Sequence, residues 1–295
     1  MALSKITDAS VANSTLTTTK LATPNLGRRN IIINGAIQVS QRGSYTTAVS
    51  VADTTYYQDR WTSVVNNGVA ATIQTKSTDQ PNGQIGNCIR VITSAGSSAA
   101  QCCVDQRIEN PQWLAGRTLT FSVWMKSNTN KAGISHYNNQ DTFVAPTNHT
   151  GGGAWEKLIL THTVNSTAPT DFRLRLGMSQ SGNTVVGVGD YFEVTEAQVE
   201  VNPEATPFEH RSYGEELALC QRYYEVIDRV YPHVYYTNVS IANFFYVTKR
   251  ATASITADTN PASLDLNVVG TTMGYLYKSG TQTAPPTNIR LDAEL

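Results

Sequence analysis

Charged residues are scarce in this sequence, and neither sign of charge dominates. They make up 15% of the 295 residues, with 22 basic residues against 23 acidic ones and a net charge of −1; typical soluble domains contain about 25% charged residues. We expect no nucleic-acid partner, because binding a phosphate backbone requires a basic face. The same balance argues against electrostatic attachment to an anionic membrane.

Cysteines are few, and long apolar runs are absent. The four cysteines form no CxxC pair, so the sequence predicts neither a zinc site nor a redox motif. No run of 18 apolar residues occurs, which argues against membrane insertion. The beginning of the chain does not resemble a secretory signal. We therefore expect the protein to be made in a reducing cytoplasm.

Motifs of common enzymes and metal sites are also missing. The five histidines show no HExxH or HxH spacing, and no GxSxG motif occurs. The acids Glu193, Glu196 and Glu200 lie in the strand-like run 191–201, where we interpret them as outward-facing residues of a strand. A pair of them could serve a glycosidase, which remains an alternative. We predict no catalytic residue, no cofactor and no metal site.

Alternation of apolar and polar residues predicts that most of the chain is β-structure. Leu119, Phe121, Val123 and Met125 alternate with polar residues, and similar patterns follow near 158–164 and 172–178. This period marks strands with one buried face. Gly-, Ser- and Asn-rich turns separate the strands. Residues 28–211 are therefore predicted to form a jelly-roll β-sandwich.

Three further segments flank the predicted sandwich. Residues 1–27 lack aromatic residues, and we interpret them as an attachment arm ordered by partner chains through regularly spaced apolar residues: Leu3, Ile6, Val11, Leu16 and Leu21. A disordered tail is the alternative. A capping box at Ser212 and Glu215 and an apolar stripe predict a linking helix over 212–231. Residues 232–295 are predicted to form a small C-terminal β-domain.

One aromatic residue stands out as a candidate for sugar binding. Trp124 falls on the polar face of its predicted strand, beside Lys126, and a polar loop follows further along the chain. Flat aromatic rings beside polar groups suit pyranose rings. The predicted glycan contacts are Trp124, Lys126, Tyr137, Asn138, Asn139 and Asp141. Coverage of Trp124 by another segment or subunit, and ordinary turn chemistry in the loop, are the alternatives.

Several motifs together resemble a family of bacteriophage tail-fibre and related virion proteins. The motifs are Asn30-Ile31-Ile32-Ile33-Asn34-Gly35, Gln41-Arg42-Gly43, Asp59-Arg60-Trp61, the block 205–217 continuing into Cys220-Gln221-Arg222-Tyr223-Tyr224, and the terminal Asp292-Ala293-Glu294-Leu295. Residues 114–126 are similar to central strands of the carbohydrate-binding-module-like jelly rolls in that family.

The resemblance implies a virion component, often trimeric, whose lectin-like domain binds host surface glycans. Our leading hypothesis is a non-enzymatic tail-fibre adhesin that attaches to other virion proteins through its arm and to host polysaccharide through its sandwich. A capsid decoration or head-fibre protein without a receptor role is the first alternative. A glycan-degrading tailspike enzyme is the second.

Overall fold

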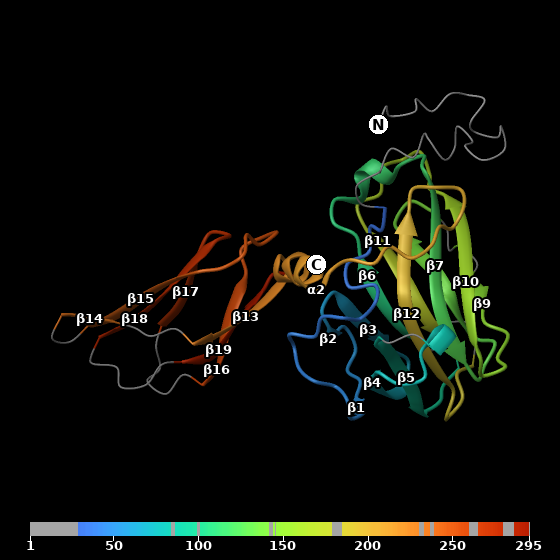
Figure 1. Ribbon diagram of the computed structural model, residues 1–295, viewed down its shortest axis with the longest axis horizontal. Helices are drawn as coiled ribbons and strands as arrows, with labels where there is room; N and C mark the ends of the chain where they lie inside the picture. Colours follow the sequence, from blue (N-terminus) through green and yellow to red (C-terminus); the bar gives the residue numbers. More distant parts are fainter. Residues whose placement is uncertain are drawn as a thin grey trace, which may run out of the picture.

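The chain forms two β-rich lobes joined through one helix (Figure 1). The computed structural model describes residues 29–83, 86–98, 101–141, 144, 146–178, 185–229, 233–236, 239–259, 265–279 and 286–294. The arm residues Leu3, Ile6, Val11, Leu16 and Leu21 lie outside the described residues. The interpretation of residues 1–27 therefore stays a prediction.

The larger lobe is a sandwich of two six-stranded antiparallel sheets. The first sheet has the order β1-β4-β5-β12-β7-β10. Its strands are β1 Val49–Ser50, β4 Ala70–Lys76, β5 Cys88–Ala95, β12 Tyr191–Glu200, β7 Thr118–Ser127 and β10 Trp155–Thr163. The second sheet has the order β2-β3-β6-β11-β8-β9. Its strands are β2 Tyr56–Gln58, β3 Trp61–Val65, β6 Cys102–Arg107, β11 Phe172–Met178, β8 Ala132–Asn138 and β9 Thr147–Asn148.

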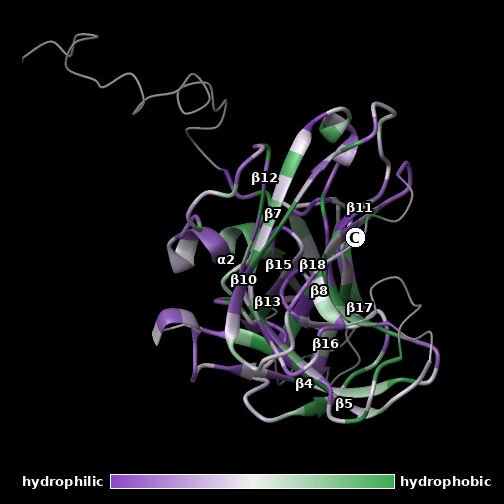
Figure 2. Cartoon of the chain, turned by 90° about the vertical axis from the view of Figure 1, so that its right-hand side faces the viewer, coloured by the Kyte–Doolittle hydropathy of each residue, from purple (hydrophilic) through white to green (hydrophobic). Residues whose placement is uncertain are grey.

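The alternation seen in the sequence builds the core between these sheets. Along β7, Leu119, Phe121, Val123 and Met125 are all fully buried in one apolar cluster, while Trp124 lies on the other face. Hydropathy changes from residue to residue along the strands in Figure 2. Successive strand residues point to opposite faces, so each sheet contributes one side to the shared core. The predicted mainly-β jelly-roll fold is confirmed.

The linking helix is shorter than predicted. Helix α2 spans Tyr213–Gln221, and the Ser212 hydroxyl accepts a hydrogen bond from the Glu215 backbone N–H at 3.3 Å, which confirms the predicted N-cap. The prediction of helix up to residue 231 is wrong, because β13 (Tyr224–Arg229) begins three residues after the helix ends. This segment is rich in aromatic and β-branched residues and pairs with β19 (Thr287–Asp292).

The smaller lobe contains two antiparallel sheets. One has the order β13-β19-β16 and the other has the order β14-β15-β18-β17. The additional strands are β14 His233–Tyr236, β15 Val239–Phe245, β16 Ser254–Thr259, β17 Asp265–Val269 and β18 Met273–Ser279. Phe244 of β15 and Tyr246, which directly follows that strand, pack with Ile289 and Leu291 of β19 in a separate apolar cluster. Short 3-10 turns occur in the larger lobe at Pro81–Gly83 and Pro111–Leu114.

Ion pairs and arginine–tyrosine cation–π contacts tie the two lobes together. Arg60 is 2% exposed, bonds the Glu294 carboxylate, and lies over the Tyr223 ring with its guanidinium carbon 3.6 Å from the ring centroid. Arg42 Nη1 bonds Asp292 at 3.0 Å, and its guanidinium lies 3.8 Å from the Tyr224 ring centroid.

Most of the motifs behind the phage-fibre resemblance therefore meet at one junction. Besides these pairs, the backbone N–H of Asn34 donates to Glu216 Oε1 at 2.6 Å, and Arg211 Nη1 lies 3.3 Å from the same oxygen. The motif residues thus serve to join the sandwich, the helix and the last strand. They do not by themselves identify a binding site.

Candidate functional site

The predicted glycan contacts do not all face the same side of the sandwich. Trp124 and Lys126 point outward from the first sheet, because Val123 and Met125 point into the core. Tyr137 is 43% exposed on β8 of the second sheet, where its neighbour His136 points inward against Phe121. The rings of Trp124 and Tyr137 therefore face opposite sides of the sandwich, and the assignment of these residues as glycan contacts stays a prediction.

The polar loop after β8 is bonded to its own neighbours. Asn138 Nδ2 donates to Asp141 Oδ2 at 2.7 Å, and Asn138 Oδ1 accepts backbone N–H groups two and three residues on. The Asn139 side chain bonds Thr170 through both its nitrogen and its oxygen. Hydrogen bonds from Asn138 and His162 lower the pKa of Asp141, although partial burial opposes the shift. These contacts match the side-chain-to-backbone chemistry of turns.

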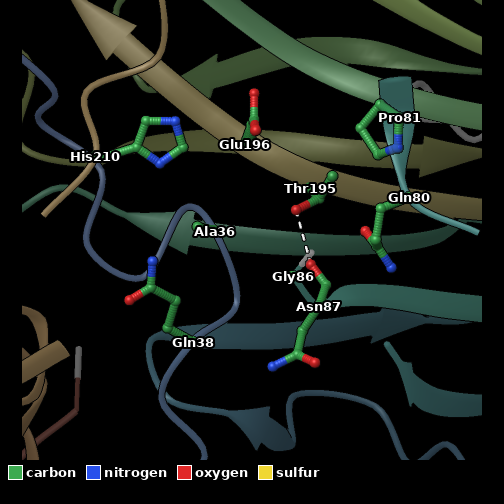
Figure 3. A pocket seen from close by; sticks show the side chains of 9 residues that line it. All are labelled: Ala36, Gln38, Gln80, Pro81, Gly86, Asn87, Thr195, Glu196 and His210. Atoms are coloured by element: carbon green, nitrogen blue, oxygen red, sulfur yellow. Dashed lines mark hydrogen bonds between the residues drawn. The ribbon is translucent and has the colours of Figure 1, made fainter. Parts of the chain in front are cut away.

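A pocket of about 170 Å³ opens instead on the outward side of the first sheet (Figure 3). Four segments line it: the chain before β1, the connection from β4 to β5, strand β12, and the linker that leads to α2. The lining residues are Ala36, Gln38, Gln80, Pro81, Gly86, Asn87, Thr195, Glu196 and His210. Most of the polar side chains around the pocket are uncharged amides and a hydroxyl.

Backbone strain borders this pocket on two sides. A β-bulge interrupts the pairing of β12 with β7 between Thr195 and Gln198, and within it Glu196 has φ of 52°. Between the lining residues Ala36 and Gln38, Ile37 has φ of 54° although it is β-branched and 2% exposed. Non-glycine residues in this region cost about 1–3 kcal/mol each, and such residues cluster at functional sites.

Close packing holds the two strained segments against each other. The Ala197 backbone N–H donates to Gly35 O at 3.0 Å. A Cβ atom at Gly35 would lie 2.2 Å from Ala197 O, so the chain can approach the bulge this closely only at glycine. The Asn87 amide donates to Ile37 O at 3.1 Å, and Thr195 Oγ1 donates to Asn87 O at 2.8 Å.

Two polar side chains of the pocket are left available to a ligand. Within the described part of the chain, neither the Gln38 amide nor the Glu196 carboxylate forms a hydrogen bond to protein. Burial raises the pKa of Glu196, while the nearby His210 and Lys157 oppose that shift. The pocket thus offers an amide, a carboxylate and an imidazole that can bond hydroxyl groups.

The half-buried ring of Trp124 lies beside this pocket. In the register of the first sheet, Trp124 is directly opposite Thr195 on β12 and directly opposite Lys157 on β10. Directly paired residues share one face with Cβ atoms about 5 Å apart. Trp124 is therefore next to the pocket wall. Lys157 lies on the side of Trp124 away from β12, and its charge still acts on Glu196.

The other two acids that the sequence offered as candidate glycosidase carboxylates, Glu193 and Glu200, are bonded to structural partners. Glu193 is fully buried and binds Lys76 at 2.9 Å and Arg90 at 2.7 Å. Glu200 is 2% exposed and accepts bonds from Gln198 and from the backbone and hydroxyl of Thr206. Glu196 alone of the three lines the pocket. Lys126 is likewise engaged, since its hydrogen bond lowers the pKa of Asp79.

Sequence reasoning found some parts of this site and missed others. It placed Trp124 on an outward strand face and identified Glu196 as a candidate acid. It did not predict that Gln38, Gln80 and His210 would lie near them. Those residues come from loops far apart in the chain, and nothing in their local sequence marks them. Among the described residues, no group of three or more His, Cys, Asp or Glu side chains is arranged to hold a metal ion. In the same residues, no helix has the length and apolar character needed to span a membrane.

Comparisons with known proteins find distant structural similarity only. No family model matches the sequence, and no curated protein matches it. A putative sugar-binding protein from Bacteroides thetaiotaomicron matches at 13% identity and a TM-score of 0.37, over 59% of this chain and 100% of that one. A xylan-binding family 22 carbohydrate-binding module matches at 12% identity and a TM-score of 0.36, over 56% and 99%.

A phage protein also occurs among the similar structures. The enzymatically active domain of tailspike protein 4 of bacteriophage CBA120 matches at 13% identity and a TM-score of 0.36. The match covers 58% of this chain but 21% of that one, about a fifth of its length. Likenesses at this distance do not bear on ligand or activity. The function proposed below therefore rests on the geometry of the site.

Proposed function

We propose that this protein is a non-enzymatic, glycan-binding adhesin of a virus particle, of the phage tail-fibre type. Its glycan site is the Glu196 pocket together with the ring of Trp124. One observation carries the proposal. Gln38 and Glu196 have no hydrogen-bond partner among the described residues. They lie at strained backbone segments and beside the half-buried Trp124.

A saccharide suits this arrangement for two reasons. The ring of Trp124 offers a flat apolar surface to one face of a pyranose, and the pocket beside it offers donors and acceptors to the hydroxyl groups. The proposal is of binding without hydrolysis, because glycosidases generally use two carboxyl groups and Glu196 is the one acid among the lining residues.

Calorimetric titration or a glycan array with bacterial surface polysaccharides tests the site. Trp124→Ala is expected to weaken binding about 5- to 150-fold, by analogy with the stacking of bases on aromatic side chains. Glu196→Gln keeps the shape but loses the charge, and it is expected to weaken binding about tenfold, as for a hydrogen bond to a charged group. Trp113→Ala is the matched control, since Trp113 is 45% exposed and lies outside this pocket.

Thermal unfolding separates a binding role from a packing role. Because Trp124 is half-buried, Trp124→Ala should lower the melting temperature by only a few degrees. Truncating a tryptophan in the core would lower the free energy of unfolding by about 3–5 kcal/mol. Unchanged binding by Trp124→Ala and Glu196→Gln would refute the site. Location in the particle is a separate question: an antibody to this protein should label tails, and labelling of the head alone would favour the capsid-decoration alternative.

A further inference from the structure

The smaller lobe presents an aromatic sheet face that packs against nothing in the described part of the chain. One side of the β14-β15-β18-β17 sheet carries Phe244 and faces the apolar cluster of that lobe. The other side carries Phe245, which is 77% exposed, and Tyr277, which is 40% exposed. Single exposed apolar residues are ordinary, but aromatic residues gathered on one outward face usually mark a binding surface.

Polar side chains stand directly opposite the tyrosines of this face. In the register of the sheet, Tyr275 is opposite Asn243 on one side and Asn267 on the other, and Tyr277 is opposite Asp265. Directly opposite residues share a face with Cβ atoms about 5 Å apart. A shallow groove of about 500 Å³ runs along these strands and is lined by Asp265, Leu266, Asn267, Tyr275 and Tyr277.

The groove combines the two features that a sugar chain requires. Tyr275 and Tyr277 are two residues apart on one strand, so their side chains are about 7 Å apart on one face and form an extended platform. Asn267 and Asp265 follow the same line and can bond hydroxyl groups along it. No cation is among the lining residues, so the groove does not favour an acidic saccharide.

We propose that this face is a second saccharide-binding surface, which takes an extended, uncharged oligosaccharide. It is independent of the Glu196 pocket, because it lies on the smaller lobe and shares no residue with that pocket. A second copy of the chain is the rival occupant. Self-association would bury the Asp265 carboxylate in a contact core, where charged groups are depleted and costly without a partner.

The test uses the full chain with the first site disabled. In a Trp124→Ala/Glu196→Gln background, cellohexaose, xylohexaose and maltohexaose are titrated by calorimetry and by saturation-transfer NMR. Adding Tyr275→Ser and Tyr277→Ser should weaken the remaining binding about tenfold or more. Tyr213→Ser is the matched control, since Tyr213 is 58% exposed at the start of α2. Thermal unfolding confirms that each variant is folded.

Each outcome decides the inference separately from the proposed function. Binding that survives in the pocket-defective background and is lost with the tyrosines supports the second surface. Binding to none of the three hexasaccharides in that background overturns it, as does binding that the tyrosine variants leave unchanged. A fall in molecular mass by light scattering in the tyrosine variants overturns it too, and assigns the face to contacts between subunits. The Trp124 and Glu196 variants in an otherwise unchanged chain still report on the pocket alone.

Discussion

Replacing His136 by phenylalanine should make the fold less sensitive to acid. The His136 ring is 1% exposed and packs beside the nearly parallel rings of Phe121 and Phe172, at centroid distances of 5.0 and 5.1 Å. Neither ring nitrogen has a hydrogen-bond partner within the described part of the chain. Burial, with a smaller contribution from His162, lowers the pKa of His136 to about 4.

The direction of the effect follows from the two pKa values. The unfolded chain takes up a proton on His136 near its ordinary pKa of 6.5, whereas the folded chain does so only near 4. The stability contribution of the neutral ring is therefore complete above pH 6.5 and is lost as the pH falls toward 4. Between pH 7 and pH 4.5 the loss is about 2.5 kcal/mol, at about 1.4 kcal/mol per pH unit.

The quantity to measure is the difference between the wild-type protein and His136→Phe. Burial raises the pKa of Asp59 to about 6, so the folded chain holds that proton more tightly and stability falls as pH rises from about 4 to 6. Asp59 thus opposes His136 over nearly the same range and flattens the wild-type profile. Denaturant unfolding gives the free energy of unfolding of both proteins at pH 7 and pH 4.5. The Asp59 contribution is the same in both proteins, so it cancels in the difference.

A matched control exists in the same lobe. His149 is also 1% exposed, but its Nδ1 accepts the Gly151 backbone N–H at 2.8 Å and its Nε2 lies 2.9 Å from Ala154 O. His149→Phe should therefore lose about 1–3 kcal/mol at pH 7, because it removes two part-buried hydrogen bonds to the backbone. If His136→Phe has the same pH dependence as the wild type, or loses as much at pH 7 as the control, His136 does not act as a neutral core filler.

Two further predictions concern the junction and the assembly. Arg60→Leu should destabilise the protein by about 1.5–3 kcal/mol in thermal or denaturant unfolding, because the Glu294 carboxylate, 5% exposed, loses one charged hydrogen-bond partner and keeps Arg42 Nη2 at 3.2 Å. Adding Glu294→Leu should restore part of that loss, and no restoration would contradict the pairing argument. At micromolar concentration, the molecular mass from light scattering should be that of a homotrimer, and deletion of residues 1–27 should reduce it to that of a monomer. A monomer mass of 32.1 kDa for the full chain would refute the predicted role of the arm.

Local pattern was enough to establish the class of fold and several of its elements. Alternation along 119–125 sets one face apolar, and burying that face requires a second sheet whatever the order of the strands. The Ser212 cap was readable for the same reason, because an N-cap depends on residues within one turn. The outward position of Trp124 also follows from a period of two.

Other features depended on contacts between distant parts of the chain. Tyr224 and Ile227 fit the stripe of a helix continued from α2, and pairing with β19, some sixty residues further on, makes this segment a strand. Tyr137 and Trp124 both point outward, but β8 and β7 belong to different sheets, so the two rings lie on opposite sides of the sandwich. Sequence spacing cannot reveal which sheet a strand joins, since that choice is made by long-range hydrogen bonding.

The candidate site also combines features that the local sequence predicted with features that depended on long-range contacts. Composition and the outward Trp124 suggested a sugar-binding protein before any contact was known. The pocket itself required Gln38, Asn87, Glu196 and His210 to come together from four segments around a bulge. A bulge and its strained φ angles are stable only where tertiary packing holds them, as Gly35 does against Ala197. Side-chain periodicity thus determined which residues face outward, and tertiary packing alone decided which of them meet.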